Sequence, residues 1–97
     1  MRVAALRVEL HLPNPHSLKE KRATLRPVIE GLRRVGSYSV AEVDHHDLWQ
    51  RAAVGVAIVA PDGDGLAMQL SRVRRYLDEQ LEVEVLDVFV SELEEPE

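Results

Sequence analysis

The stretch AAVGVAIVA, residues 52–60, decides the fold of this chain. It is an uninterrupted run of small and β-branched apolar residues, which is typical of a strand. A strand that carries no polar side chain on either face is typical of the centre of a sheet, where both faces are covered. We therefore predict a sheet in which residues 52–60 form a central strand.

Three further strands are predicted on either side of this run. Residues 3–12 alternate apolar and polar side chains, which predicts a half-buried strand, and Pro13-Asn14-Pro15 ends it because proline has no amide donor. Residues 37–43 form a shorter strand. Residues 83–90 are rich in β-branched side chains and form the fourth.

Two amphipathic helices are predicted in the remaining segments. The first begins with a capping box, in which Ser17 accepts from an early helix amide and Glu20 reaches back. Pro27 predicts a kink or break, because an interior proline costs about 3 kcal/mol, and Gly36 is the predicted end. The apolar arc of this helix consists of Leu18, Leu25, Val28, Ile29, Leu32 and Val35. The second helix follows the turn at residues 61–65, and its apolar positions are Leu66, Leu70, Val73, Leu77 and Leu81.

The resulting order is β-α-β-β-α-β. With right-handed crossovers, this order predicts an α+β protein of the ferredoxin-like plait, with an antiparallel sheet in the order 4-1-3-2 and both helices on one face. We expect a single domain over residues 1–97, with residues 91–97 as a frayed acidic tail.

Composition limits the classes of function. The chain has no cysteine, which excludes disulfides and thiolate metal sites, and no apolar run approaches the ~20 residues of a membrane span. The first residues alternate in polarity, so we expect no signal peptide, no membrane contact and a cytoplasmic location. The net charge is −5, but residues 82–97 carry seven acidic and no basic side chains. The rest of the chain is therefore mildly basic, which permits a local contact with an anion.

The polar stretch AEVDHHDLWQR, residues 41–51, is predicted to lie at one end of the sheet. By the topology above, the hairpin that contains it emerges at the same end as the loop 13–17 and the start of the first helix. Any site should therefore occupy this shared end. The candidate binding residues are Ser17, Lys19, Lys21, Arg22, Arg26, Asp44, His45, Asp47, Trp49 and Arg51.

Lys21 is the most informative of these residues. It falls inside the apolar arc of the first helix, where a lysine is costly unless it reaches water or an anion. The nearest expected partners are Asp44 and Asp47. A structural ion pair and a functional contact with a substrate phosphate or carboxylate both stay open.

Two segments, SLKEKR at 17–22 and VAEVDHHDLWQRA at 40–52, resemble the YlxP-like family of small bacterial proteins, whose family label is a domain of unknown function. The resemblance covers nearly the whole chain. It implies a ferredoxin-like fold. Because the family's genes often lie among those for transcription, translation initiation and ribosome maturation factors, it also implies a role linked to RNA or the ribosome. It supplies no catalytic residue.

Enzymatic readings are weaker. Asp44, His45, His46 and Asp47 are possible metal ligands, with His11 and His16 nearby, but an extended backbone points neighbouring side chains to opposite faces. A histidine beside Asp47 would make an acid–base dyad, yet the chain offers no nucleophile elbow or glycine-rich phosphate loop. We expect no cofactor and no catalysis. A metal-dependent enzyme that uses residues 44–47 stays an alternative.

Two kinds of partner, RNA and a second copy of the chain, fit the distribution of charged and apolar residues better than an enzymatic role does. RNA is expected to bind through its phosphates on the basic start of the first helix, where Trp49 either stacks on a base or packs as an anchor. The open sheet face is predicted to be apolar around Ala5, Ala53, Ala57, Val59 and Phe89, which favours a homodimer through that face. The main prediction is therefore a non-enzymatic adaptor for RNA or a ribosome-associated factor, and a ligand-sensing dimer is the alternative.

Overall fold

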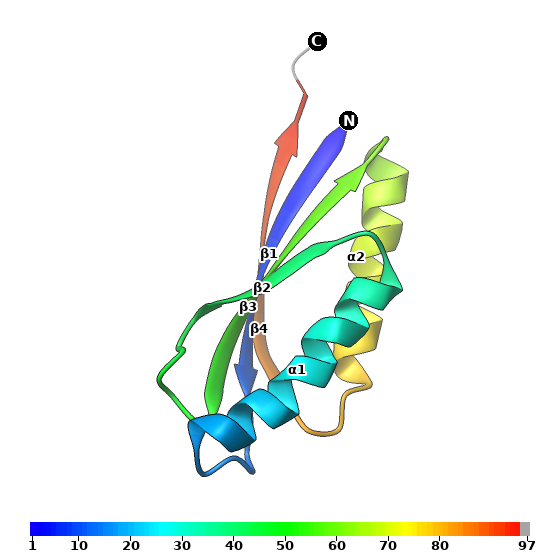
Figure 1. The fold of residues 1–97 in the computed structure, drawn as a ribbon. Helices are drawn as coiled ribbons and strands as arrows, with labels where there is room; N and C mark the ends of the chain where they lie inside the picture. The colour runs from blue at the N-terminus through cyan, green and yellow to red at the C-terminus, as the bar shows by residue number, and fades with distance from the viewer. Residues whose placement is uncertain (96–97) are drawn as a thin grey trace.

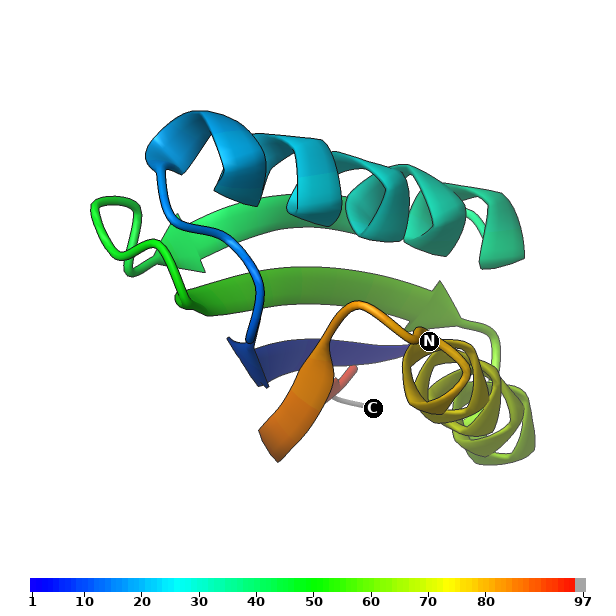
Figure 2. The same ribbon diagram turned by 90° about the horizontal axis from the view of Figure 1, so that it is seen from below.

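The computed structural model describes residues 1–95 and has the predicted element order (Figure 1). The elements are β1 (Arg2–His11), α1 (Leu18–Val35), β2 (Ser39–Asp44), β3 (Arg51–Ala60), α2 (Gly63–Asp78) and β4 (Glu84–Glu94). All neighbouring strands are antiparallel in the order β2-β3-β1-β4, which is the predicted order read from the other edge. Both helices cover the same face of this sheet, as predicted (Figure 2).

The core lies between the sheet and the two helices. Leu6, Val8 and Leu10 of β1 are buried, while the alternate residues of β1 face the other way. β3 is central, as predicted, but it is not covered on both faces. Ala57 is exposed and Val59 is 67% exposed, because neither α1 nor α2 covers the far face of the sheet. That uncovered face is called the open face below.

The start of α1 forms the predicted capping box with one difference. The Ser17 hydroxyl accepts from the amide of Glu20 at 3.0 Å. The Glu20 carboxylate reaches back to the amide of His16, also at 3.0 Å, rather than to that of the cap residue itself. These contacts satisfy amides that would otherwise lack partners at the helix start.

Pro27 does not break α1, so of the predicted kink or break the break is wrong. The helix runs without interruption over 18 residues and ends at Gly36, as predicted. Pro27 and Ala23, whose carbonyl loses its usual amide donor, both lie on the exposed face of the helix. Water can therefore hydrogen-bond to that carbonyl, and the apolar residues on the opposite face hold the helix together.

Two boundaries in the second half of the chain also differ from prediction. β4 continues to Glu94 because Ser91 and Leu93 pair with the first half of β1, so residues 91–94 are not a frayed tail. The last part of that predicted tail, residues 96–97, lies outside the described residues. α2 ends at Asp78, which leaves Leu81 beyond the helix and 98% exposed instead of in its apolar face.

The two helices meet through Tyr76. Its hydroxyl, on α2, donates to the Val28 carbonyl of α1 at 3.0 Å. The ring lies directly against Gly31, which has no side chain to obstruct it. Within residues 1–95, no helix is long and apolar enough to cross a membrane.

Candidate functional site

The β2–β3 hairpin and the segment before α1 meet at one end of the molecule (Figure 2). The Gln50 side-chain amide donates to the carbonyls of Pro13 and Pro15 at 3.2 and 3.3 Å. The Leu12 amide donates to the Gln50 carbonyl at 3.0 Å. The predicted juxtaposition of the two segments is confirmed. Gln50, which sequence reasoning passed over, holds them together.

Lys21 connects α1 to this hairpin from inside the molecule. Its side chain is 2% exposed, and its Nζ lies 2.8 Å from a carboxylate oxygen of Glu42 and donates to the His45 carbonyl at 2.7 Å. The prediction that Lys21 pairs with Asp44 or Asp47 is wrong. The β2–β3 ladder shifts register between Glu42 and Asp44, and this bulge turns Asp44 to the open face while Glu42 points toward the helices.

Asp44 instead joins a charged network on the open face. It accepts from Arg7 at 2.9 Å. Glu9, whose side chain is only 13% exposed, accepts from Arg7 at 3.1 Å and from Arg51 at 3.3 Å, and lies 3.0 Å from Nε2 of His45. Three candidate residues, Asp44, His45 and Arg51, therefore share one cluster with two strand residues that were not predicted as site residues.

This network shifts the ionisation of its carboxylates. Burial raises the pKa of Glu9. Hydrogen bonds from Arg7, His45 and Arg51 lower it by more than burial raises it, so the pKa of Glu9 lies below its usual value. The Arg7 guanidinium and the backbone amide of His45 lower the pKa of Asp44. Hydrogen bonds to Asp44 and Glu9 raise the pKa of Arg7. The two arginines, Arg7 and Arg51, and the two carboxylates, Glu9 and Asp44, therefore neutralise one another within the chain.

The backbone of His45 has a positive φ of 62°, which is uncommon outside glycine. Its amide donates to the Asp44 carboxylate at 2.8 Å, and its carbonyl accepts from the Leu48 amide at 3.0 Å, which closes the turn. His46 points elsewhere, with Nε2 3.2 Å from the Glu42 carbonyl. Within the described part of the chain, no group of three or more metal-type side chains is placed to hold an ion.

The cations of the sheet all form ion pairs, whereas most of those on the helices form none with the described side chains. Of the twelve lysines and arginines, five form ion pairs: Arg2, Arg7, Lys21, Arg33 and Arg51. The other seven have no ion-pair partner among the side chains that the structure describes, and all lie on helices: Lys19, Arg22, Arg26 and Arg34 on α1, and Arg72, Arg74 and Arg75 on α2. Free positive charge is therefore concentrated on the helical layer.

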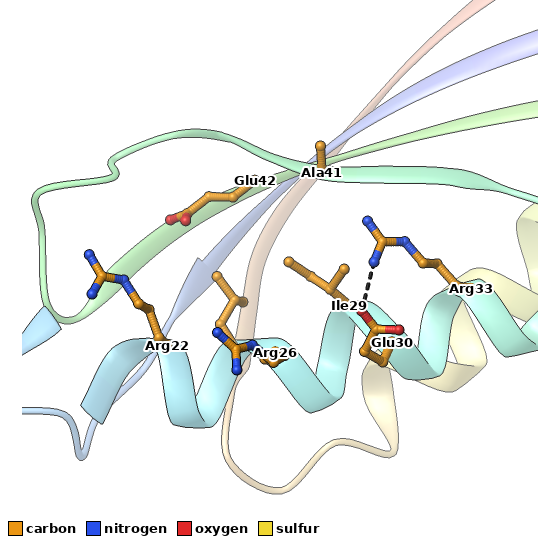
Figure 3. Close-up of a pocket in the computed structure, with 8 residues that line it drawn as sticks. Arg22, Arg26, Ile29, Glu30, Arg33, Ala41 and Glu42 are labelled. Atoms are coloured by element: carbon orange, nitrogen blue, oxygen red, sulfur yellow. Dashed lines mark hydrogen bonds and ion pairs between the residues drawn. The ribbon is translucent and has the colours of Figure 1, made fainter. Parts of the chain in front are cut away.

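A groove of about 350 Å³ lies between α1 and β2 (Figure 3). It is lined by Arg22, Leu25, Arg26, Ile29, Glu30, Arg33, Ala41 and Glu42. Both carboxylates are already neutralised, since Glu30 pairs with Arg33 at 2.7 Å and Glu42 pairs with Lys21. The other two arginines of the lining leave the groove with an excess of positive charge.

Two exposed apolar side chains lie on the hairpin at the same end. Trp49 is 51% exposed and Leu48 is 49% exposed, so the tryptophan is not a buried packing anchor. The sequence-predicted residues thus fall in three places: the open-face network, the buried Lys21 and the surface of α1 with the hairpin tip. Glu9 and Glu42 were missed. Period-two alternation places Glu9 on the open face and, counted from the buried Val40, also places Glu42 toward the helices. No sequence signal marked the bulge after Glu42 that turns Asp44 to the open face.

Comparison with known proteins decides the family. The model of the family described as protein of unknown function, DUF503, matches residues 3–90. The chain belongs to this family. The chain is also similar to the uncharacterized protein YlxP of Bacillus subtilis strain 168, with 34% identity over 68 residues that cover 70% of this chain and 74% of that protein.

Solved structures with a similar fold share little sequence with this DUF503 protein. An antibiotic biosynthesis monooxygenase matches with a TM-score of 0.55 at 14% identity, over 100% of both chains. The de novo designed protein Foldit4 matches at 0.52 and 14% identity over 98% of both chains. The structural-genomics protein YJCS matches at 0.50 and 7% identity, over 92% of this chain and 96% of that one. At these identities the likeness shows the α+β fold alone.

Proposed function

We propose that this protein is a non-enzymatic RNA-binding adaptor that contacts the phosphates of RNA, free or in ribosomal particles, through the start of α1. The observation that supports this proposal is the row of Lys19, Arg22 and Arg26, which are exposed and have no ion-pair partner among the described side chains. Charged side chains that are not neutralised within the chain remain available to an anionic partner.

The position of this row strengthens the attraction. All three residues lie in the first half of α1, and Lys19 lies in the first turn, where the positive end of the helix dipole adds to its charge. Nearby, Trp49 is exposed and able to stack on a base. Binding that releases counterions from phosphates weakens steeply with salt, with log K falling by about 0.9 per contact per tenfold salt on duplex nucleic acid.

The test is co-sedimentation with ribosomal particles from a bacterial lysate at rising salt. A variant with Lys19, Arg22 and Arg26 changed to glutamate should be lost from these fractions by at least about tenfold. The matched control changes Arg72, Arg74 and Arg75 of α2 to glutamate, because these are equally free cations and the change in net charge is identical. The control should sediment like the unaltered protein.

Three outcomes separate the readings. Loss of the α1 variant alone supports the proposal. Equal loss of both variants would show that only net charge matters, and no loss of the α1 variant would overturn an RNA contact at this surface. Nuclease treatment of the lysate before the spin should release the unaltered protein. A protein partner on the ribosome would instead keep it bound.

A second candidate is a sheet-paired dimer, and the shape of the open face favours it. A shallow hollow of about 250 Å³ lies over β2, β3 and β1, lined by Ala5, Leu6, Ser39, Ala41, Val43, Gly55, Val56 and Ala57. Phe89 stands on the same face and is 54% exposed. Arg7 of β1 lies in register with Gly55 on one side and Phe89 on the other. A two-fold axis along β1 would therefore place Phe89 of each copy over the hollow of the other.

The charged groups of this face do not oppose such pairing, because they already balance one another within the chain. Sedimentation velocity tests the arrangement. Phe89→Lys and Ala57→Glu should each abolish the dimer, and mixing the two variants should restore it, since one of the two contacts is then unaltered and the other pairs opposite charges. A monomeric unaltered protein at tens of micromolar, or no dimer in the mixture, would remove this candidate. An apolar ligand held in the hollow is what a sensing role would require.

A further inference from the structure

The groove between α1 and β2 has the chemistry of a nucleotide site. Its walls combine two free guanidinium groups, from Arg22 and Arg26, with apolar side chains, the buried Leu25 and the half-buried Ile29 (Figure 3). Guanidinium groups match phosphate oxygens in charge and geometry. Apolar surface between them suits a base or a ribose, and about 350 Å³ lies within the range of small-ligand sites.

The edge of β2 adds directed hydrogen-bond donors. β2 is an edge strand. The Val40 carbonyl accepts from Arg33 at 2.8 Å and the Glu42 carbonyl lies 3.2 Å from Nε2 of His46, so both carbonyls point away from β3. In an antiparallel strand the amide of a residue points to the same side as its carbonyl. The amides of Val40 and Glu42 therefore also point away from β3, and the amide of Glu42, which lines the groove, can donate to an acceptor atom of a base.

We propose that this groove binds one unstacked nucleotide of single-stranded RNA, with its phosphate on Arg22 and Arg26 and its base or ribose against Leu25 and Ile29. The inference rests on the proposed function, since it specifies the kind of RNA that α1 contacts. Leu25 and Ile29 form the floor of the groove. A duplex keeps its bases stacked and paired inside, so its phosphates reach the outer surface of α1 but its bases do not reach this floor. The protein should therefore prefer single strands.

Amide chemical-shift mapping by NMR locates the contact directly. The probes are hexauridylate and a blunt RNA duplex of equal phosphate content, each titrated into the ¹⁵N-labelled chain at low salt. Hexauridylate should shift the amides of Ile29, Val40 and Glu42 as well as those around Arg22, and should bind at least about tenfold more tightly than the duplex. The single tryptophan gives a parallel readout through its fluorescence.

Two variants separate the parts of the groove. Arg26→Gln should weaken hexauridylate binding severalfold by removing a phosphate contact. Ile29→Glu places a carboxylate on the floor and should weaken hexauridylate more than the duplex. Arg34→Gln, a free cation farther along the same helix, is the matched control for Arg26 and should change little.

The outcomes distinguish this inference from the function on which it rests. If both RNAs bind equally and shift only exposed amides of α1, the groove is not a nucleotide site, while RNA binding stands. If neither RNA shifts any amide at low salt, RNA binding itself fails. If Ile29→Glu lowers the affinity for both RNAs equally, the floor does not contact a base and the inference is wrong.

Discussion

Removing the carboxylate that neutralises Lys21 should cost more stability than removing Lys21 itself. In Glu42→Ala, an ammonium that is 2% exposed keeps the carbonyl of His45 as its one partner within residues 1–95. Deleting one member of a buried ion pair costs about 3–5 kcal/mol, because the other charge is left without compensation. We expect a loss near the lower end, about 3 kcal/mol, since that carbonyl remains at 2.7 Å.

The reverse deletion should be milder. In Lys21→Met, the Glu42 oxygen that paired with the lysine is itself buried, but the Glu42 side chain as a whole is 22% exposed, so the carboxylate can turn toward water. A flexible apolar side chain also replaces the lysine stem in the core. We expect a loss of about 1–2 kcal/mol, in the usual range for single substitutions. The double variant should lose no more than Lys21→Met alone, because no buried charge is left.

Urea unfolding followed by circular dichroism measures these differences, and thermal unfolding gives a second estimate. For a domain of this size, about 1 kcal/mol shifts the melting temperature by roughly 4–8 °C, so Glu42→Ala should melt roughly 12–24 °C lower. The reasoning is refuted if Glu42→Ala costs less than Lys21→Met. It is refuted equally if the two losses simply add in the double variant, since charges that contact each other must couple.

Three further predictions follow from individual contacts. Gly31→Ala should destabilise the protein by about 1–3 kcal/mol in urea unfolding, because the new methyl group would overlap the Tyr76 hydroxyl. This change normally stabilises a helix by about 1 kcal/mol, and such a gain here would contradict the packing of Tyr76 against Gly31. Because the pKa of Glu9 is lowered on folding, its contribution is present above the ordinary value of 4.5 and is lost as the pH falls through the lowered value. The stability gap between the unaltered protein and Glu9→Gln should therefore shrink below pH 4.5, and a gap that stays constant down to pH 3 would argue against the network. Ser17→Ala should cost about 1 kcal/mol, with Ser17→Asp close to neutral as its control, and equal losses in both would show that the cap hydrogen bond is unimportant.

Much of the fold could be predicted from the sequence because its signals are local and repeated. The alternation of Leu6, Val8 and Leu10 with polar residues marks β1, and the apolar run of residues 52–60 marks a central strand. Once the order of elements was known, connection rules placed the hairpin beside the start of α1. The burial of Lys21 followed from helical periodicity alone.

The remaining features depend on contacts between distant segments. The partner of Lys21 was predicted wrongly because a bulge after Glu42 turns Asp44 to the open face, while Glu42 stays on the helix-facing side with Val40. No residue type announces this bulge. Pro27 was expected to kink or break α1, but the helix continues through it, since the exposure of Pro27 makes the lost hydrogen bond inexpensive. The strand over residues 91–94 forms because β1 supplies its hydrogen-bond partners, although its own acidic composition disfavours a strand.

The salt dependence of RNA affinity tests the central claim most directly. Fluorescence anisotropy with a labelled single-stranded RNA should be measured from 50 to 200 mM salt for the unaltered protein, for Lys19, Arg22 and Arg26 changed to glutamine, and for Arg72, Arg74 and Arg75 changed to glutamine. Loss of three phosphate contacts should reduce the slope of log K against log salt by about 2, at about 0.7 per contact on a single strand. We predict that reduction for the α1 variant and an unchanged slope for the α2 variant. Equal slopes for all three proteins would contradict the claim that the free cations of α1 bind RNA phosphates.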